Sequence, residues 1–297
     1  MYPDILSILR CPCCGSSFHT EAAVCEQDEI VEGSLVCEQG HSYPIRDGVV
    51  CFGAQEQAGS NTWSEYYKEA DYDEVDRAID SRKTPAQLDA QQKLLDAITT
   101  QTSQLESGFL LDIASGRGML LRQLLKTTSA KVHIIATDLS YPVLKFDRIK
   151  LRAVNPNVRV SYLACDATDY PIRDNSVDMA CTFAGLLNMQ ELMERGLQDA
   201  HRILKPGSLL VNSTIYQQDG TAAFQSLRRL LEENGSAKLA DYCLRDKLLE
   251  IHRNIFASVE NEIACEGIAE AMEGDLLPLG GEWFANAVIL ARKERAS

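Results

Sequence analysis

The segment Leu110-Leu-Asp-Ile-Ala-Ser-Gly-Arg-Gly118 has the features of a ligand-binding turn. An apolar run suited to a buried strand reaches Asp112, and a run of small residues follows it. The small residues are Ala114, Ser115, Gly116 and Gly118. Small side chains let the backbone pass close to a ligand, and a helix that begins near Gly118 presents free N–H groups. Alone, this turn is weak evidence for any particular ligand, because many α/β proteins have a glycine-rich first loop.

Two more carboxylates follow strand-like runs further along the chain. Asp138 ends Ile134-Ile-Ala-Thr-Asp138, twenty residues after Gly118, where a carboxylate can accept hydrogen bonds from both hydroxyls of a ribose. Asp166 ends a third run and can accept a hydrogen bond from the exocyclic amine of an adenine. Each acid alone could also be a helix cap or a loop carboxylate. Three acids at three consecutive strand ends predict a nucleoside site at the carboxyl edge of one sheet.

A second group of residues at the N-terminus could hold a metal ion. Cys11-Pro-Cys-Cys14 gives one pair of ligands, Cys11 and Cys14, and Cys37-Glu-Gln-Gly-His41 gives another, Cys37 and His41. Two such pairs separated by a loop are typical of structural zinc, whose binding supplies folding energy that some 50 residues lack. Cys13 and Cys25 are alternative ligands, although adjacent Cys13 and Cys14 do not easily bind one ion. The competing interpretation is a ribbon that has lost its metal.

The elements that must position these residues alternate between strands and helices. Expected strands cover Phe109–Ile113, Lys131–Thr137, Val158–Ala164, Val177–Phe183 and Ser208–Ile215. Expected helices between them cover Met119–Lys126, Pro142–Val154 and Leu192–Leu204. This order predicts an α/β fold with a parallel sheet. Two late strands, Val259–Cys265 and Trp283–Ala291, are expected to pair antiparallel.

The pattern divides the chain into three parts. Residues 1–53 form a zinc ribbon, residues 54–104 a linker and helical cap, and residues 105–297 a cofactor-binding domain. The linker is expected from Gly53 to Asn61. Thr84 and Pro85 predict the start of a helix, whose apolar face would be Leu88, Leu94, Leu95 and Ile98. The insertion from Gln217 to Arg253 is expected to be helical and to cover the acceptor.

Composition and charge argue against several classes of protein. The formal net charge of -14 argues against a surface that attracts nucleic acid as a whole. The stretch from Lys145 to Arg159, with five basic residues, allows one local basic patch, although a solvated helix face is the interpretation we favour. The sequence has no apolar run long enough for a membrane span and no secretory signal, so we expect a cytoplasmic protein. It gives no indication of the oligomeric state.

The motifs together resemble the class I S-adenosylmethionine-dependent methyltransferases, in particular those with the methyltransferase type 11 pattern. The matching pieces are Leu111-Asp-Ile-Ala-Ser-Gly-Arg-Gly118, Thr137-Asp-Leu-Ser140, Cys165–Asp178 and Ala200-His-Arg-Ile-Leu-Lys-Pro-Gly207, within residues 105 to 292. The resemblance implies a Rossmann-like sheet with a late antiparallel strand pair. The third acid, the Leu-Lys-Pro-Gly turn and that pair favour a methyltransferase over an NAD enzyme.

The resemblance also implies roles for single residues. Asp112 and the turn from Ala114 to Gly118 would hold the methionine part of S-adenosylmethionine. Asp138 with Leu139 would hold the ribose, and Asp166 with Ala167 the adenine, with Phe183 near the cofactor. Two residues depart from the family pattern: Ala114, where glycine is usual and alanine is tolerated if its φ is negative, and Ser208, where a second glycine is usual.

The N-terminal part resembles two kinds of zinc ribbon. Ile5 to Cys14 and Tyr43-Pro-Ile-Arg-Asp-Gly-Val-Val50 are similar to the small zinc-ribbon proteins that partner some methyltransferases. The cysteine and histidine spacing also resembles the N-terminal zinc domain of bacterial rRNA guanine-N1 methyltransferases, in which the ribbon helps to recognise RNA. Acidic residues outnumber basic ones in this ribbon, which speaks against RNA recognition.

The methyl acceptor is the open question. Methyl transfer mainly needs alignment of the acceptor with an already activated sulfonium, and the sequence identifies no catalytic residue. Asn188 could orient an acceptor or end a helix, and Tyr216 is expected at the same edge. Trp63, Tyr66 and Tyr67 either belong to a helix that closes over the cofactor, as in some relatives, or pack ordinarily. We favour a small-molecule acceptor. An rRNA or tRNA base methyltransferase and a non-enzymatic cofactor-binding scaffold are the alternatives.

Overall fold

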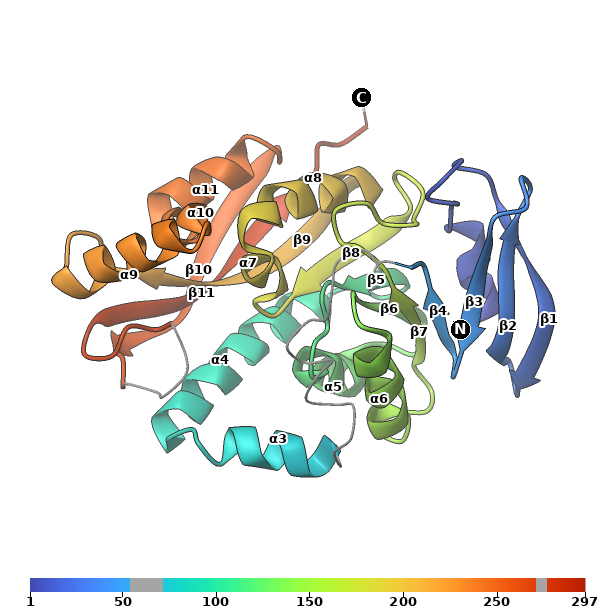
Figure 1. The fold of residues 1–297 in the computed structure, drawn as a ribbon, viewed down its shortest axis with the longest axis horizontal. Coiled ribbons are helices and arrows are strands. Elements are labelled where there is room, and N and C mark those ends of the chain that lie inside the picture. The colour runs from blue at the N-terminus through green and yellow to red at the C-terminus, as the bar shows by residue number, and fades with distance from the viewer. Residues whose placement is uncertain (54–71, 271–276, 297) are drawn as a thin grey trace.

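A computed structural model describes residues 1–53, 72–270 and 277–296 of the chain. Its centre is one eleven-stranded sheet with the order β1-β2-β3-β4-β7-β6-β5-β8-β9-β11-β10 (Figure 1). The strands are β1 Phe18–Glu26, β2 Glu29–Cys37, β3 Ser42–Arg46, β4 Val49–Cys51, β5 Gly108–Asp112, β6 Val132–Asp138, β7 Arg159–Ala164, β8 Val177–Thr182, β9 Leu204–Gln217, β10 Ser258–Ile268 and β11 Trp283–Arg292. The run from β7 to β9 is parallel, as expected from the alternating pattern.

Helices cover both faces of this sheet. They are η1 Pro3–Ser7, α3 Tyr72–Asp80, α4 Pro85–Thr102, α5 Met119–Thr127, α6 Tyr141–Leu151, α7 Gly185–Asn188, η2 Gln190–Leu192, α8 Met193–Ile203, α9 Ala222–Glu233, α10 Ala237–Tyr242 and α11 Arg245–Arg253. Successive strand residues point to opposite faces, so Leu110 packs with α4 and α5 while Leu111 packs in the core that α8 shares. Figure 1 shows α4, α5 and α6 on one side of the sheet and α7 to α11 on the other.

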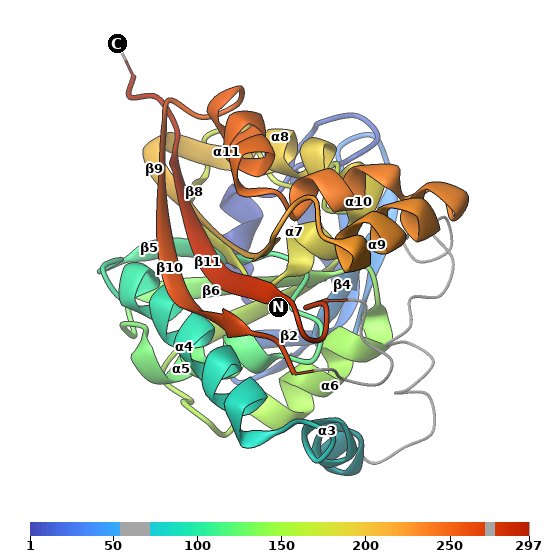
Figure 2. The same cartoon turned by 90° about the vertical axis from the view of Figure 1, so that its left-hand side faces the viewer.

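The late strands and the cap helix agree with the sequence prediction, with one exception. β10 and β11 pair antiparallel, and β11 lies between β10 and β9, also antiparallel to β9 (Figure 2). Thr84 caps α4 with a capping box and Pro85 is its first residue. Leu94, Leu95 and Ile98 are buried, whereas Leu88 is 39% exposed, so the expectation that it belongs to the apolar face is wrong. Leu88 lies in the first turn of α4.

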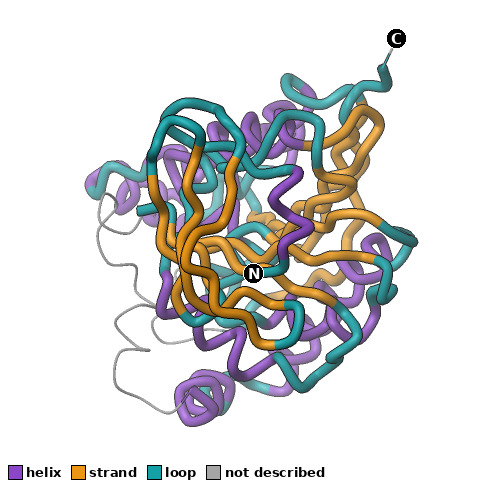
Figure 3. Tube along the Cα trace, turned by 90° about the vertical axis from the view of Figure 1, so that its right-hand side faces the viewer, coloured by secondary structure: helices purple, strands orange, loops and turns teal. Residues whose placement is uncertain are grey.

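The ribbon, defined here as residues 1–53, continues the sheet rather than forming a separate body. β4 pairs parallel with β7, with Val49 opposite Tyr162 and Cys51 opposite Ala164. Figure 3 shows the ribbon strands lying against this edge of the molecule. The ribbon's Ile5 and Leu35 belong to the same apolar core as Leu163. The pairing satisfies the backbone groups of β7, which would otherwise form an open edge.

The basic stretch from Lys145 to Arg159 is largely an interface with the ribbon, not a solvated helix face. Four of its side chains form ion pairs with ribbon carboxylates: Lys145 with Asp47 at 3.0 Å, Arg148 with Glu29 at 2.7 Å, Arg152 with Glu26 at 3.3 Å and Arg159 with Asp4 at 3.2 Å. The fifth, Lys150, pairs with Asp76 and Asp147. The sequence could not show this, because every ribbon partner is more than 90 residues away along the chain.

No helix in the described ranges is both long enough and apolar enough to cross a membrane.

Candidate functional site

The small-residue turn lies between the end of β5 and the start of α5. Asp112 is the last residue of β5 and is 1% exposed, and its Oδ2 accepts a hydrogen bond from the Ser115 hydroxyl at 2.8 Å. Gly116 and Gly118 have φ of +54° and +67°, the left-handed region that favours glycine. Among the described residues, a Cβ on Gly116 would have only the carbonyl oxygen of Ala114 near it, at 3.8 Å. The turn therefore presents an open backbone surface next to a buried carboxyl group.

Ala114 differs from the expectation, because its φ is +52° and not negative. The condition under which alanine costs nothing at this position is therefore not met. An L-residue in the left-handed region costs roughly 1–2 kcal/mol, and the turn carries this strain where glycine is usual. Packing holds the alanine in place: a Cβ on Gly185, which follows β8, would lie 2.8 Å from the Cβ of Ala114.

Replacing Ala114 with glycine is expected to stabilise the protein by about 0.5–1 kcal/mol, because relief of the strain exceeds the entropy that glycine loses on folding. The measurement is thermal unfolding, in which the midpoint should rise by about 2 °C. Ala97→Gly within α4 is the matched control and should lower the midpoint. A lower midpoint for Ala114→Gly would show that the methyl group contributes more through packing than it costs in strain.

Asp138 is placed to organise the turn from the neighbouring strand. It ends β6, is 7% exposed, and its Oδ2 accepts a hydrogen bond from the N–H of Gly116 at 3.1 Å. Its Oδ1 accepts another from the N–H of Ser140 at 2.9 Å. Leu139, which lies between them, is partly buried. The carboxylate thus joins the first and second strand ends.

Asp166 lies at the end of the third strand, as the sequence predicts, but it is exposed. Its Oδ1 accepts a hydrogen bond from the N–H of Thr168 at 2.7 Å, and Ala167 is partly buried. The N–H of Cys165, just before it, donates to the carbonyl of Asp138 at 2.9 Å. The structure therefore brings all three acids to one edge of the sheet.

The ribbon holds the loop that follows Asp166. Arg10 donates to Asp169 Oδ1 at 2.9 Å from its side chain and to the Pro171 carbonyl at 3.0 Å from its backbone N–H. The N–H of Arg173 donates to the carbonyl of Ile8 at 2.8 Å. Sequence reasoning missed Arg10, and its position next to Cys11 was the only signal that it belongs to a built site. The segment that precedes Cys11 therefore helps to hold the loop that follows β7.

Phe183 follows β8 and is partly buried, packed against the core on the α4 and α5 face. Gly185, which the sequence reasoning also missed, closes this side of the site: a Cβ on it would lie 2.6 Å from the carbonyl of Ile113. The N–H of Ala184 donates to the Ser213 hydroxyl of β9 at 2.8 Å. The residues that follow β5 and β8 are thus packed together beside β9, without space for a larger residue at position 185.

The other residues considered for the acceptor side lie in different environments. Asn188 is exposed and ends α7. Tyr216 is 1% exposed within β9, and its hydroxyl donates to Asn261 Oδ1 at 2.7 Å, so it is part of the core and not of an open edge. Trp63, Tyr66, Tyr67 and most of the expected linker lie outside the described residues. The insertion after β9 is helical, as expected, and forms α9, α10 and α11.

The donors and acceptors at this edge fit S-adenosylmethionine. Burial raises the pKa of Asp112 to about 7, the hydrogen bond from Ser115 opposes this, and the nearby Asp138 carboxylate adds to it. Within the described part of the chain, Asp112 Oδ1 has no hydrogen-bond partner. A buried acceptor without a donor is costly, so a ligand that brings a cationic donor suits this position.

The pKa of Asp112 predicts a pH-dependent affinity for S-adenosylhomocysteine, whose ammonium group stays protonated across the range tested. The ammonium favours the ionised carboxylate. Because the pKa lies near 7, the ionised fraction rises from about a tenth at pH 6 to about nine-tenths at pH 8. Calorimetry should show an affinity that rises about tenfold between these values, with proton release at pH 6. Asp112→Asn, which cannot titrate, should lose this slope, and an equal slope in the variant would contradict the assignment.

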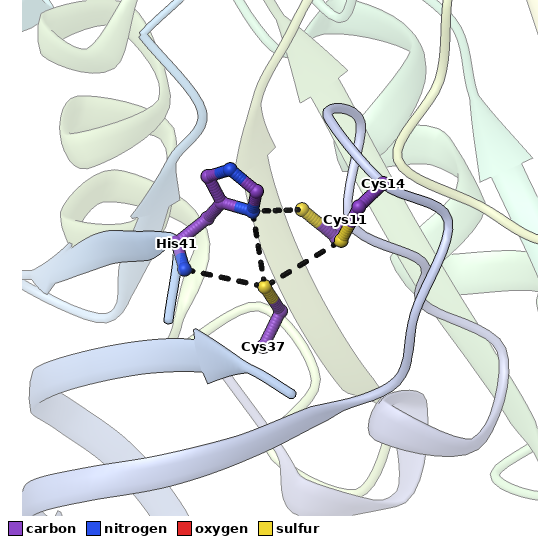
Figure 4. Close-up of side chains that lie close together, drawn as sticks. All are labelled: Cys11, Cys14, Cys37 and His41. Atoms are coloured by element: carbon purple, nitrogen blue, oxygen red, sulfur yellow. Dashed lines mark hydrogen bonds between the residues drawn. The ribbon is translucent and has the colours of Figure 1, made fainter. Parts of the chain in front are cut away.

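The four metal-ligand candidates converge in the ribbon (Figure 4). The ligand atoms of Cys11, Cys14, Cys37 and His41 all lie within 4.8 Å of one another. Ligands of a tetrahedral zinc ion are about 3.8 Å apart for two sulfurs and about 3.6 Å for a sulfur and a nitrogen. The observed separations are 3.7 Å between the sulfurs of Cys14 and Cys37, and 3.7 and 3.3 Å from His41 Nδ1 to the sulfurs of Cys11 and Cys37.

The alternative ligands lie outside this group. The Cys13 sulfur lies 3.2 Å from the Tyr43 hydroxyl, and Cys25 is exposed on β1. The set of three cysteines and one histidine thus fits a structural zinc ion, with four protein ligands and no position left open for a substrate.

Comparison with known proteins finds a family match for each part of the chain. Residues 111–212 match the model of the methyltransferase domain family, and residues 3–48 match that of the Trm112p-like proteins. The first match runs from the end of β5 through β9 and includes all three strand-end acids. This part of the chain has a class I methyltransferase fold. The strand order from β7 to β10, with β11 inserted antiparallel, is the architecture of its sheet.

Solved structures show the same fold at low sequence identity. The methyltransferase domain superimposes on phosphoethanolamine N-methyltransferase 2 of Haemonchus contortus, solved with phosphomonomethylethanolamine and S-adenosylhomocysteine. That match has a TM-score of 0.52 at 18% identity and covers 68% of this chain and 52% of the other. The MccD protein matches with a TM-score of 0.53 at 15% identity over 68% of this chain and 96% of the other.

Relatives found by sequence are named as methyltransferases of quinone biosynthesis. A demethylmenaquinone methyltransferase of Clavibacter sepedonicus is 32% identical over 140 residues, 47% of this chain and 54% of the relative. The ubiquinone/menaquinone biosynthesis C-methyltransferase UbiE of Idiomarina loihiensis is 34% identical over 98 residues, 33% of this chain and 39% of the relative. The chain thus spans about half or less of the length of these curated relatives.

Proposed function

We propose that this chain is an S-adenosylmethionine-dependent methyltransferase that acts on a small-molecule acceptor. The observation that carries the proposal is the gathering of Asp112, Asp138 and Asp166 at consecutive strand ends around a turn with an open backbone surface. The match of residues 111–212 to the methyltransferase domain family supports it.

The roles of the residues follow from their chemistry. When bound, the cofactor supplies a methyl group already activated by its sulfonium, and the protein has to bind and align the reactants. Asp112 and the turn from Ala114 to Gly118, including Ser115 and Gly116, hold the methionine part. The side-chain oxygens of Asp138 and Asp166 accept hydrogen bonds from the ribose and the adenine amine, beside Leu139 and Ala167. Phe183 packs near the bound nucleoside.

A small acceptor is favoured over RNA by the charges of the ribbon interface. An RNA partner needs accessible Lys and Arg side chains. Arg152 and Arg159 are half exposed, but every basic residue of the stretch from Lys145 to Arg159 is paired with a carboxylate of the same chain, four of them in the ribbon, so the stretch carries no excess positive charge. The quinone names of the relatives make a reduced demethylnaphthoquinone the first acceptor to test.

The test follows radiolabelled methyl groups from S-adenosylmethionine into two pools. One contains a reduced demethylmenaquinone analogue that is extracted into organic solvent, and the other contains total RNA that is precipitated with acid. We expect label in the solvent phase and none in the RNA, with Asp138→Ala as the inactive control. Label in RNA alone would replace the proposal with an RNA base methyltransferase. Absence of calorimetric heat with both S-adenosylmethionine and S-adenosylhomocysteine would favour the scaffold interpretation.

A further inference from the structure

A buried ammonium group lies directly behind the cofactor turn. Lys150, on α6, has a side chain that is only 5% exposed. Its Nζ donates to the carbonyl of Arg117 at 2.6 Å and to Asp76 Oδ2 at 3.1 Å, and it lies 3.3 Å from Asp147 Oδ1. An ammonium group has three N–H donors, and here it has three acceptors from three different elements. One of these acceptors is the backbone of the turn itself.

Arg117, the residue between the two left-handed glycines, is also held by its side chain. Its guanidinium lies 3.2 Å from Asp76 Oδ1 and 3.5 Å from Asp80 Oδ1. Asp76 therefore uses one oxygen for Arg117 and the other for Lys150. Asp76 and Asp80 are on α3, which lies below α6 in both Figures 1 and 2. The turn is thus fixed at its backbone by α6 and at its side chain by α3.

The third acceptor, Asp147, lies directly under the turn. A Cβ on Gly118 would be 2.6 Å from Asp147 Oδ1, so the backbone rests on this carboxyl group. Asp147 is 1% exposed, and burial raises its pKa well above the usual range while Lys150 lowers it. The nearby Asp112 and Asp138 carboxyl groups also raise it. A buried acid in such surroundings depends on its cationic partner.

We propose that Lys150 is a positioning residue that locks the turn from Ala114 to Gly118 and the helix α3 into one unit, so that docking of α3 and binding of the adenosyl cofactor reinforce each other. The turn contains three left-handed residues: Gly116 and Gly118 have little conformational preference of their own, and Ala114 is disfavoured in this region. The contacts of Lys150 select one conformation of the turn and couple it to α3. This inference rests on the proposed function only for the identity of the ligand.

The test compares Lys150→Met with two matched variants. Lys150→Met removes the ammonium but keeps a long side chain. Lys150→Met/Asp147→Asn also removes the buried carboxyl group that loses its partner. Arg152→Met, on the same stretch, removes an exposed cation whose partner is Glu26. For each protein, hydrogen exchange of residues 72–80 and 114–118 is measured without ligand. The melting temperature and the affinity for S-adenosylhomocysteine are then determined.

We expect Lys150→Met to increase exchange in both segments at least tenfold, to lower the melting temperature and to weaken S-adenosylhomocysteine binding about tenfold. The double variant should recover most of the melting temperature but neither the slow exchange nor the affinity. Arg152→Met should resemble the wild type.

Recovery of affinity together with the melting temperature in the double variant would overturn the proposal, because Lys150 would then only neutralise Asp147. Unchanged exchange in Lys150→Met would also overturn it. If the wild type does not bind S-adenosylhomocysteine, the proposed function fails. The exchange data would still show whether Lys150 holds the turn and α3 together.

Discussion

Replacing Cys37 with serine is expected to abolish zinc binding and, with it, most of the affinity for S-adenosylhomocysteine. Cys37 is 2% exposed, and its sulfur lies within 4 Å of two other members of the ligand set. Structural zinc contributes about 10–16 kcal/mol to the folding of small zinc domains. The rest of the ribbon is held by the shared core and by the pairing of β4 with β7, so loss of one ligand should unfold only the part of it around the metal.

The effect should reach the cofactor site because the ribbon supports it directly. Arg10 precedes Cys11, and it holds Asp169 and the Pro171 carbonyl in the loop after Asp166. β4 also covers the edge of β7, whose end leads to Asp166. If the ribbon unfolds, this loop loses its partners and an apolar edge becomes exposed. We therefore expect the affinity for S-adenosylhomocysteine to fall at least tenfold and the chain to aggregate more readily.

The measurements are the zinc content by mass spectrometry, the melting temperature and calorimetric binding. Cys13→Ser and Cys25→Ser are the controls, because both residues lie outside the ligand set and both are exposed. They should retain one zinc ion per chain and wild-type affinity. A Cys37→Ser protein that lacks zinc but binds S-adenosylhomocysteine normally would show that the ribbon does not support the site.

The parts of the site that the sequence predicts are those encoded locally. Asp112, Asp138 and Asp166 each follow an apolar strand, and parallel strands bring their carboxyl ends to one edge. Cys11 with Cys14 and Cys37 with His41 are likewise close pairs along the chain. In both sites, spacing of a few residues and the order of strands were enough to bring the right groups together.

The parts that the sequence could not predict depend on contacts between distant segments. Nothing near Lys145 or Arg148 indicates that their partners are Asp47 and Glu29, and the stretch therefore looked like a solvated helix face. The φ of Ala114 also depends on its surroundings, because an alanine has no local preference for the left-handed region. These features arise from the docking of the ribbon and from packing at the end of β8.

Replacing Asp138 with alanine should have the largest effect on the cofactor site itself. The carboxylate accepts hydrogen bonds from the N–H groups of Gly116 and Ser140, so its loss releases the turn and the start of α6 together. It would also remove the proposed acceptor for the ribose. Hydrogen bonds to a charged acceptor contribute roughly 1.5–3 kcal/mol each. A total loss of about 3 kcal/mol corresponds to a Kd about a hundredfold higher.

Asp166→Ala provides the comparison within the same site. Asp166 is exposed and its carboxylate accepts one backbone hydrogen bond, from Thr168, so its replacement should weaken binding by about tenfold only. Calorimetry with S-adenosylhomocysteine, and the rise in melting temperature that this ligand causes, measure both variants. Which of the two variants loses more affinity tests the arrangement of the carboxylates better than either Kd alone. If Asp166→Ala were as damaging as Asp138→Ala, the two backbone hydrogen bonds of the buried Asp138 carboxylate would contribute no more to binding than the single one of Asp166.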